Sequence, residues 1–516
     1  MAHWLNLGEI FPVNAEKYPN KTCLCDESRS FTYKQTEERT NRLANALLGK
    51  GLNKGDKIAV LLENCIEFIE IYVAAAKAGL VVVPVNFRHV AEEVAFIADN
   101  ADAKAFIVHE EWIEMIEGIK GDLQKIPGSN YICVGGNTQG FVPYEDFLAA
   151  AGDRAPGIEV LPKDTWILLY TSGTTGKPKG VVRSHESYIA FYLINGIDFR
   201  FDQDEICMNV MPLCHVNSTY FTLNVTYLGG TVYVHPARRF EPVELLDVIE
   251  REKITFISLV PTHYHLILNV QDDIRAKYDT SSIRKLLCSS APARRETKLG
   301  IMEFFPGVQL YEGYGSTEAG IVTTLFPNEQ LKKLGSIGRE STGTAKIKIL
   351  DEKKRPVAKG QVGELYSMGP MLFDEYYKMP EKTAGSHAGE YFSAGDMAYE
   401  DEDGYYYLVD RKDNMIITGG EKVFPSEVES LITSHEDVFD VACIGLSDAK
   451  WGEIVTAVVI PRKGRELKEQ DLIDFCKDKI AGFKRPKKVI FISQDDMPRT
   501  ATGKILHRKL KERFDK

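Results

Sequence analysis

A loop rich in glycine and hydroxyl side chains is the strongest chemical signal in the sequence. It reads TSGTTGKPKG and covers residues 171–180. Small residues let backbone N–H groups approach phosphate oxygens closely, and Lys177 and Lys179 add positive charge. Only two residues separate Gly173 from Gly176, and a proline follows Lys177, which excludes the P-loop of kinases and GTPases. The loop also lacks the GxGxxG pattern of dinucleotide binders, so it predicts phosphate chemistry of another kind.

A second glycine-rich stretch, YEGYGSTEAG at residues 311–320, also suits a nucleotide. The ring of Tyr314, carried on a glycine-rich turn, can cover a purine face. Thr317 can donate a hydrogen bond to a phosphate, and Glu318 can hold Mg²⁺, which prefers carboxylate and phosphate oxygens. Taken alone this signal is weak, because Gly-Tyr-Gly turns are common, and a purely structural loop is the alternative.

These stretches, together with five further motifs in the same order, resemble the AMP-binding, acyl-activating superfamily of acyl-CoA synthetases, carrier-protein adenylation domains and luciferases. The resemblance covers essentially the whole chain. The further motifs are MPLCHVNS (211–218), CSSAPARRE (288–296), YFSAGD (391–396), DRKDNMIITGGEKVFPSEVE (410–429) and MPRTATGKILHRKL (497–510). The resemblance implies that a carboxylate attacks the α-phosphate of ATP, that pyrophosphate leaves, and that a thiol then displaces AMP from the acyl adenylate.

The resemblance also implies roles for single residues. Lys504 is expected to bridge the acyl carboxylate and the α-phosphate, where a cation offsets developing charge. Thr317 should reach the α-phosphate, and Glu318 the Mg²⁺. His215 either lines the acyl pocket and gates the thiol tunnel or is a packed histidine. The other expected ATP- or AMP-binding residues are Thr171, Ser172, Gly173, Thr174, Thr175, Gly176, Lys177, Ser290, Ala291, Gly313, Tyr314, Asp396 and Arg411.

The acyl pocket is expected to contain His215, Val216, Asn217 and Gly313, with Gly313 leaving space. Asn217 either meets a polar acyl group or caps a helix. The match looks closest to ligases for fatty, aromatic, alicyclic or carnitine-type acids, and the sequence does not choose among them. Two departures from the family pattern, Ala394 in the ribose motif and Asp410 before the hinge arginine, remove no assigned group.

Coenzyme A is the favoured thiol, because no carrier domain follows the lysine motif. The glycine pair Gly419-Gly420 matches the one that lets pantetheine pass in CoA ligases of this superfamily. Asp413 matches the family's hinge, and Lys484 and Arg485 either meet CoA phosphates or lie in a solvated basic loop. A stand-alone acyl-AMP ligase that serves a carrier protein is the alternative. A binding-only protein is disfavoured, since the lysine, the metal carboxylate and the ribose aspartate are all present.

Composition restricts the setting of this chemistry. The 516 residues are 44% apolar and 27% charged, as in globular proteins, and the net charge of −11 argues against general nucleic-acid binding. Nine scattered cysteines without a CxxC pair predict reduced thiols and a cytoplasmic protein. The longest apolar stretch, residues 71–85, contains Lys77 and is too short to span a bilayer. A homodimer is compatible with the sequence.

The elements that must position these residues follow an α/β pattern. Residues 57–62 and 80–85 read as buried strands on either side of a helix at 66–79, which is a βαβ unit in a parallel sheet. Residues 103–109 and 165–171 read as further strands, the second leading into the glycine-rich loop. We therefore expect a large α/β domain of several subdomains with covered sheets at 1–410, which holds the ATP and acyl pocket.

A small mobile α+β domain is expected at 411–516, and it carries Lys504. Its expected strands lie at 438–446, 453–461 and 487–492, and its amphipathic helix at 466–480. Ser426, with Glu429 three residues on, has the spacing of a capping box at the start of another helix.

Overall fold

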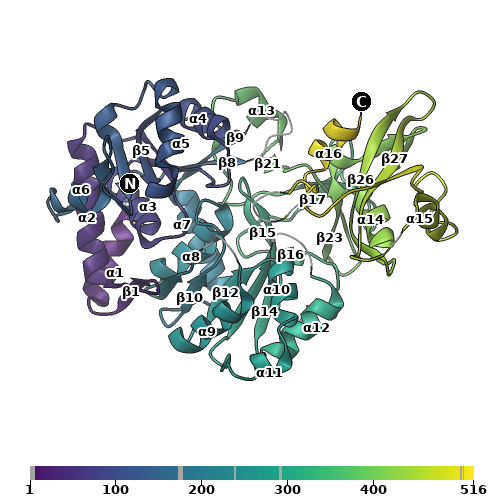
Figure 1. The fold of residues 1–516 in the computed structure, drawn as a ribbon, viewed down its shortest axis with the longest axis horizontal. Helices are drawn as coiled ribbons and strands as arrows, with labels where there is room; N and C mark the ends of the chain where they lie inside the picture. The colour runs from purple at the N-terminus through teal and green to yellow at the C-terminus, as the bar shows by residue number, and fades with distance from the viewer. Residues whose placement is uncertain are drawn as a thin grey trace. The chain divides into compact units, whose positions relative to one another are not determined.

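The computed structural model describes residues 6–171, 178–236, 240–289, 293–465, 467–499, 503 and 505–515. The chain forms two compact units (Figure 1). Unit 1 contains Met1–Lys346 and Ser367–Phe392, and unit 2 contains Ile347–Tyr366 and Ser393–Lys516. The expected boundary at 410–411 lies inside unit 2, and its role as the hinge of a mobile domain stays a prediction.

An eight-stranded sheet of unit 1 contains the predicted βαβ unit. Its order is β19-β9-β8-β4-β3-β5-β6-β7, and β3 pairs in parallel with β4 and β5. Helix α3 ends at Gly79, whose φ of +66° suits glycine at a left-handed C-cap. The strands are β3 Lys57–Leu61, β4 Val81–Pro84, β5 Ala103–His109, β6 Tyr131–Val134, β7 Val142–Pro143, β8 Thr165–Thr171, β9 Lys179–Ser184 and β19 Glu375–Tyr376.

A nine-stranded sheet forms the second layer of unit 1, in the order β16-β15-β14-β13-β12-β10-β11-β1-β2. Strands β10 to β14 run parallel, and β14 and β15 form an antiparallel hairpin. The strands are β1 Thr22–Cys25, β2 Ser30–Thr32, β10 Ile206–Asn209, β11 Thr231–Val234, β12 Phe256–Leu259, β13 Lys285–Ser289, β14 Gln309–Ser316, β15 Gly320–Leu325 and β16 Arg339–Glu340. A pair formed by β20 (His387–Ala388) and β21 (Tyr391–Phe392) completes the strands of this unit.

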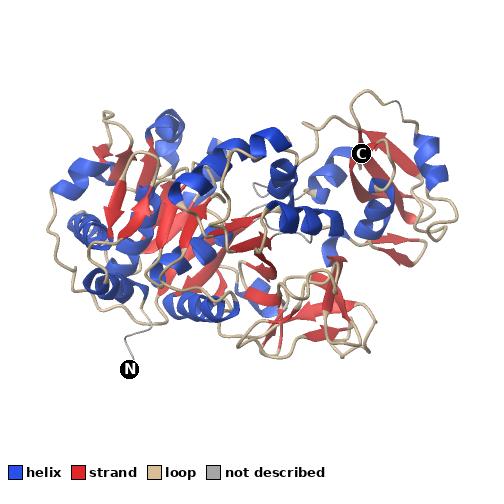
Figure 2. Ribbon diagram, turned by 90° about the horizontal axis from the view of Figure 1, so that it is seen from below, coloured by secondary structure: helices blue, strands red, loops and turns tan. Residues whose placement is uncertain are grey.

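Helices cover these sheets, as Figure 2 shows. Helices α7 and α8 are largely buried, and α8 packs on α7, β10 and β11. Burial of the polar α8 sequence VNSTYFTLNVTY places hydroxyl and amide groups deep inside the unit. The helices are α1 Ile10–Lys17, α2 Tyr33–Gly49, α3 Ile66–Ala78, α4 Ala91–Asn100, α5 Ile113–Ile119, α6 Tyr144–Ala149, α7 His185–Asp198, α8 Val216–Tyr227, α9 Pro242–Glu252, α10 Pro261–Leu268, α11 Asp272–Arg275, α12 Arg295–Phe304 and α13 Pro380–Gly385. None of the described helices is long and apolar enough to cross a membrane.

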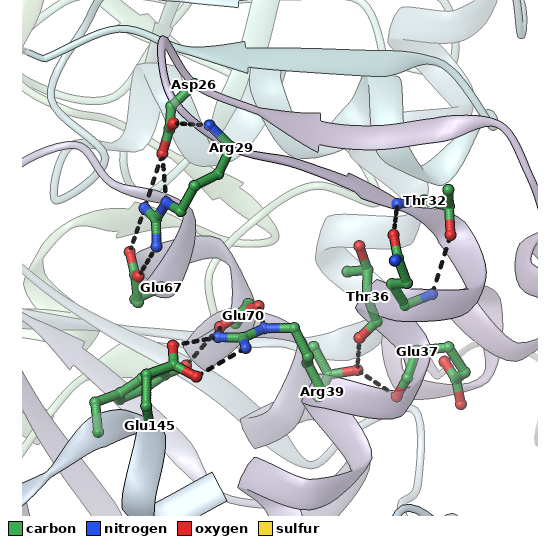
Figure 3. A network of polar contacts seen from close by, with 12 residues as sticks. Asp26, Arg29, Thr32, Thr36, Glu37, Arg39, Glu67, Glu70 and Glu145 are labelled. Atoms are coloured by element: carbon green, nitrogen blue, oxygen red, sulfur yellow. Dashed lines mark hydrogen bonds and ion pairs between the residues drawn. The ribbon is translucent and has the colours of Figure 1, made fainter. Parts of the chain in front are cut away.

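Ion pairs tie α2, α3 and α6 together (Figure 3). Arg39 of α2 reaches Glu70 of α3 with its Nε, 2.5 Å from Oε1, and Glu145 of α6 with its Nη2, 2.7 Å from Oε1. Arg29, just before β2, pairs with both Asp26 and Glu67. Each of these two arginines therefore has two carboxylate partners. The pairs of Arg39 link α2 to both α3 and α6.

Unit 2 contains a four-stranded sheet, β17-β18-β22-β23, and a five-stranded sheet of β25-β24-β27-β26 with β28 beside β27. The strands predicted at 438–446, 453–461 and 487–492 are confirmed as β26, β27 and β28, whereas the predicted helix is shorter, as α15. The elements are β17 Lys348–Leu350, β18 Gly363–Tyr366, β22 Asp396–Glu400, β23 Tyr406–Arg411, β24 Ile416–Thr418, β25 Glu421–Val423, β26 Val438–Asp448, β27 Gly452–Pro461, β28 Lys488–Phe491, α14 Pro425–Thr433, α15 Glu469–Phe475 and α16 His507–Phe514.

The predicted capping box at Ser426 is wrong. Helix α14 begins one residue earlier, at Pro425, whose fixed φ suits the first helical position. The hydroxyl of Ser426 donates to the carbonyl of Val409 instead, and Glu429 accepts a hydrogen bond from the backbone N–H of Cys443 at 2.7 Å. Both side chains therefore form hydrogen bonds to residues outside α14 and do not cap the helix.

Candidate active site

The stretch 311–320 forms the β14–β15 hairpin rather than an extended glycine-rich turn. Strand β14 continues to Ser316, so Tyr314 lies on a strand, paired with Thr323 of β15. A Cβ at position 315 would lie 2.0 Å from the carbonyl oxygen of Gly320, which explains the glycine there. The turn itself is short and presents Thr317 and Glu318, the two residues expected at the α-phosphate and the metal.

Glu318 is a buried carboxylate with a cation and a hydroxyl beside it. Lys179 Nζ and the hydroxyl of Tyr376 each lie 2.8 Å from its Oε1. Burial raises the pKa of Glu318, but the charge and hydrogen bond of Lys179 and the hydrogen bond of Tyr376 outweigh it, and the pKa is lowered. Glu318 is therefore ionised, and both of these hydrogen bonds go to one oxygen.

A second cation of β9 holds the other residue of the turn. Arg183, four residues after Lys179 on the same strand, is fully buried and donates from Nη1 to the carbonyl oxygen of Thr317 at 2.7 Å. The same nitrogen contacts the hydroxyl of Tyr220 on α8. Its Nη2 has no hydrogen-bond partner among the described residues. Two cations of one strand thus fix the Thr317–Glu318 turn, and neither was assigned to the turn from the sequence.

One expected acyl-pocket residue, Asn217, contacts residues near the carboxyl ends of two parallel strands, β12 and β13. Asn217 donates to Ser289 Oγ at 2.9 Å and accepts from Ser258 Oγ at 3.1 Å. Ser258 lies on β12 and Ser289 ends β13, in register with Gly313 of β14. Ligands of open α/β sheets bind at such strand ends. We name Asn217, Ser258 and Ser289 the amide–hydroxyl triad.

Two expectations for this region need correction. Asn217 does not cap α8, because the N-cap is His215, whose Nδ1 accepts from the backbone N–H of Asn217 at 3.3 Å. The space expected at Gly313 is filled, since a Cβ there would meet Cδ1 of Ile321 at 3.0 Å. Val216 and His215 are both partly exposed, so the structure leaves them accessible at the start of α8.

Much of the expected phosphate loop lies outside the described residues. Thr171 is described: it ends β8, pairs with Lys179 of β9, and its buried hydroxyl has no hydrogen-bond partner in the described structure. Of this strand pair, Lys179 also contacts Glu318. The expected residues outside the described part are Ser172, Gly173, Thr174, Thr175, Gly176, Lys177, Ser290, Ala291 and Lys504.

In unit 2 the structure brings the two expected ribose residues together. Asp396 begins β22 and Arg411 ends β23, and the strands pair them directly. Arg411 Nε lies 2.7 Å from Asp396 Oδ1, and its Nη1 donates to the carbonyl of Ala394 at 2.7 Å. The carboxylate is mostly buried, while the arginine is half exposed. Asp413 follows in an exposed short 3₁₀ segment, Lys412–Asn414.

The glycine pair 419–420 forms the two-residue turn between β24 and β25. Both residues have positive φ, +60° and +85°, which such a hairpin turn demands of glycine. A Cβ on Gly419 would also lie 2.8 Å from Cε3 of Trp451, whereas Gly420 has no such neighbour. The pair therefore has a conformational reason, and its expected role toward a thiol stays a prediction.

Of the two basic residues expected near CoA, Lys484 is engaged within unit 2. Its Nζ lies 2.7 Å from the carboxylate oxygens of Glu427 on α14. Arg485 follows directly in the chain, and both residues are partly buried. The solvated-loop interpretation and the CoA interpretation both stay predictions for this segment.

Comparison with known proteins agrees with this geometry. The family described as "AMP-binding enzyme" matches residues 11–377, and its "AMP-binding enzyme C-terminal domain" matches residues 427–504. The chain belongs to this family. It is 33% identical to a feruloyl-CoA synthase of Amycolatopsis sp over 509 residues, 98% of each chain. It is 33% identical to the long-chain-fatty-acid–CoA ligase FadD13 of Mycobacterium tuberculosis over 516 residues, 99% of this chain and 98% of the other.

Among solved structures, ATP-bound MatB from Rhodopseudomonas palustris superposes with a TM-score of 0.88 at 28% identity and covers 99% of both chains. An anthranilate CoA ligase in complex with anthranoyl-AMP gives a TM-score of 0.87 at 27% identity, covering 98% of this chain and 97% of the other. These matches confirm the α/β fold class, the superfamily and its acyl-CoA synthetase branch, and hence the class of acid–thiol ligases.

Proposed function

We propose that this protein is an AMP-forming acyl-CoA synthetase: it activates a carboxylic acid as acyl adenylate, releases pyrophosphate, and transfers the acyl group to coenzyme A. The observation that carries the proposal is the Thr317–Glu318 turn, held by Lys179 and Arg183 beside the ends of β8 and β9. A hydroxyl, an ionised carboxylate and two cations at one turn suit the triphosphate of ATP and its metal.

The Glu318 carboxylate fits one ligand position of Mg²⁺. Lys179 and Tyr376 occupy Oε1, and no described side chain donates to Oε2. The described residues contain no group of three or more His, Cys, Asp or Glu side chains that could hold a metal by themselves. Mg²⁺ is usually held by one or two carboxylates together with substrate phosphates. When bound, it would neutralise charge on the phosphates of ATP.

The other roles in adenylation follow from the same arrangement. We infer that Thr317 donates to the α-phosphate, that Tyr314 and Gly313, with Ser290 and Ala291, line the adenine pocket, and that the loop 171–177 donates to the departing pyrophosphate. Asp396, oriented by Arg411, accepts from the ribose hydroxyls. Lys504 brings a positive charge to the acyl carboxylate and the α-phosphate, which orients the weak nucleophile and offsets the charge of the transition state.

For the second half-reaction we infer that the C-terminal domain, residues 411–516, rotates about Asp413 so that Lys504 leaves and the thiol approaches. Asp413 is exposed, in a short segment where a few backbone dihedrals can absorb the change. Gly420, Lys484 and Arg485 are proposed for the path of coenzyme A, and His215 for the gate at the acyl group. All nine cysteines are free thiols, which supports a reducing compartment, the cytoplasm.

The amide–hydroxyl triad bears on the acid. An amide side chain can make four hydrogen bonds, and Asn217 uses two of them within the triad. Its remaining capacity favours an acid that carries a hydrogen-bonding group over a plain alkyl chain. Its relatives include an indoleacetate–CoA ligase and a crotonobetaine/carnitine–CoA ligase. We infer that the acid is aromatic or carries another group that can form hydrogen bonds.

The test is formation of AMP and acyl-CoA with ferulate, indoleacetate, carnitine, crotonobetaine and a matched series of alkanoates. We expect acid-dependent AMP release that requires CoA, with a polar-substituted acid preferred to the alkanoate of equal length. Acid-dependent pyrophosphate exchange without CoA consumption would point instead to an acyl-AMP ligase that serves a carrier protein. Absence of exchange with every acid would contradict the proposal.

A further inference from the structure

The loop that carries Lys504 is closed by described residues on both sides. Arg499 and Ile505 form an antiparallel bridge, and the N–H of Leu506 donates to the carbonyl of Pro498 at 2.9 Å. Arg499 also donates from Nη1 to the carbonyl of Gly503, the residue before the lysine, at 2.9 Å. We name the segment 498–506 the lysine loop; its described residues at the two ends bond to each other, and residues 500–502 and 504 lie outside the described part.

Two ion pairs attach the two ends of this loop to the rest of unit 2. On the upstream side, Arg499 pairs with Asp440 of β26. On the downstream side, His507, the first residue of α16, lies with Nε2 2.7 Å from Oε1 of Glu429 on α14. The same Glu429 oxygen accepts from the backbone N–H of Cys443 on β26 at 2.7 Å. The Glu429 carboxylate thus has a second partner that holds it in place, and the His507 pair attaches the first residue of α16 to α14.

His507 differs from Arg499 because it titrates near neutral pH. Burial lowers the pKa of His507, but the hydrogen bond and charge of Glu429 and the charge of Asp410 on β23 outweigh it, and the pKa is raised. The third group near Glu429 is the Cys443 thiol of β26, whose pKa burial raises well above its ordinary value, so it stays neutral. On α16 itself, Arg508 pairs with Glu512 and Lys511 pairs with Glu453 of β27.

We propose that His507 is a positioning residue for Lys504: in its protonated form it pairs with Glu429 and fixes the downstream end of the lysine loop for adenylation. Only the last part of this proposal, the effect on adenylation, rests on the proposed function. Because the folded-state pKa of His507 is raised, the pair is complete at and below the ordinary histidine value. It is lost as pH rises through the raised value. Adenylation should then lose efficiency at high pH, and the thiol step should not.

The structural arm of the test is amide hydrogen exchange of residues 498–507 in the full chain at about pH 6 and about pH 9. The variants are His507→Arg, a permanent cation, and His507→Gln, which is neutral. His435→Gln is the matched control, since His435 contacts Asp437 and Phe475 and lies outside the lysine loop. Each variant is compared with the wild type at the same pH, so that the intrinsic pH dependence of exchange cancels.

At the lower pH we expect His507→Gln to exchange about tenfold faster than the wild type, the size of a lost charge-assisted hydrogen bond. At the higher pH the wild type should approach His507→Gln, while His507→Arg stays protected. The control should follow the wild type throughout. Equal exchange in the wild type, both His507 variants and the control would contradict a role of the His507–Glu429 pair in holding the loop. A wild type that is as protected at the higher pH as at the lower pH would contradict it too. The wild-type pH series decides this even where a variant folds poorly.

The functional arm is pyrophosphate exchange with the acid that gives most acyl-CoA, beside acyl-CoA formation from supplied acyl adenylate. We expect the ratio of exchange rates, His507→Arg to wild type, to rise about tenfold between the two pH values, with the thiol step unchanged in that ratio. A flat ratio would overturn the positioning role even if hydrogen exchange follows the charge. If no acid supports pyrophosphate exchange, the proposed function fails. Amide hydrogen exchange alone then still tests whether the His507–Glu429 pair holds the loop.

Discussion

Glu70 and Glu318 are two buried carboxylates of unit 1 with the same kinds of partner, a cation and a tyrosine hydroxyl. Glu70 uses both oxygens: Arg39 reaches Oε1 from Nε at 2.5 Å and Oε2 from Nη2 at 3.1 Å (Figure 3). Tyr144 donates to Oε2 at 2.8 Å. Glu318 receives both of its partners, Lys179 and Tyr376, on Oε1.

We infer from this difference that Glu70 stabilises the fold and that Glu318 is available to a ligand. Arg39 fits Glu70 in a forked geometry that leaves neither oxygen unused, and buried pairs of this kind are costly to break. The point charge of Lys179 lowers the pKa of Glu318 while one oxygen stays without a described side-chain donor. The comparison predicts that changes around Glu70 affect stability and that changes around Glu318 affect catalysis.

The largest effect is expected for Arg39→Ala, because it leaves Glu70 fully buried without its cation. We expect a loss of about 3–5 kcal/mol in the free energy of unfolding of the cooperative unit that contains α2 and α3. The activity of the molecules that remain folded should stay within about twofold of wild type, since no site residue is touched. Urea unfolding, with activity measured per folded molecule, checks both.

The matched control is Arg42→Ala on the same helix, whose pair with Asp153 at 3.1 Å is largely exposed. Such a pair is worth at most about 1 kcal/mol. Equal destabilisation by the two substitutions would contradict the assignment of the Glu70 network as the structural one.

The next effect is expected for Glu318→Gln, which keeps an acceptor for Lys179 and Tyr376 but removes the charge. Adenylation should fall by about 100-fold, in line with the loss of one electrostatic contact in a preorganised site. The Mg²⁺ concentration needed for half-maximal pyrophosphate exchange should rise, and the melting temperature should change little. An unchanged Mg²⁺ requirement, or a loss of activity that only follows unfolding, would show that Glu318 is structural like Glu70.

The smallest effects are expected for a matched tyrosine pair, each losing one hydrogen bond to a carboxylate. Tyr144→Phe should lower the free energy of unfolding by about 2 kcal/mol and leave adenylation unchanged. Tyr376→Phe should raise the KM for Mg-ATP by about threefold to tenfold with a smaller loss of stability. If both variants lower the free energy of unfolding and neither changes the KM for Mg-ATP, the two carboxylates do not differ in the way we infer.

Local sequence patterns predicted the helices and strands, but they did not predict contacts between residues far apart in the chain. The β3–α3–β4 unit was predictable because its apolar periodicity and the glycine at its end act within a few residues. The pairing of Lys179 with Glu318 joins positions 139 residues apart, and that of His507 with Glu429 joins positions 78 apart. No spacing rule specifies such partners, because the fold and not the helix or strand period brings them together.

The same reason explains the errors at particular residues. Ser426 had the spacing of a cap, but the carbonyl of Val409 competes for its hydroxyl once β23 lies beside α14. Gly313 suggested open space, but a Cβ there would meet the side chain of Ile321, which pairs with Gly315 on the facing strand. The segment Ile347–Tyr366 belongs to unit 2, although nothing in its composition separates it from the residues before it. Motif identity proposed the candidate site, which stays a prediction, and packing around the motifs could not be predicted from it.

The most direct test of the account is to measure the two half-reactions separately in Lys504→Ala and Asp413→Pro. Pyrophosphate exchange reports adenylation, and acyl-CoA formation from supplied acyl adenylate reports thiol transfer. We predict opposite phenotypes: Lys504→Ala loses adenylation by orders of magnitude and retains transfer, because the positive charge is needed only at the α-phosphate. Asp413→Pro retains adenylation and loses transfer, because a fixed φ restricts the hinge. Equal loss of both half-reactions in either variant would contradict one site that works in two arrangements of the C-terminal domain, residues 411–516.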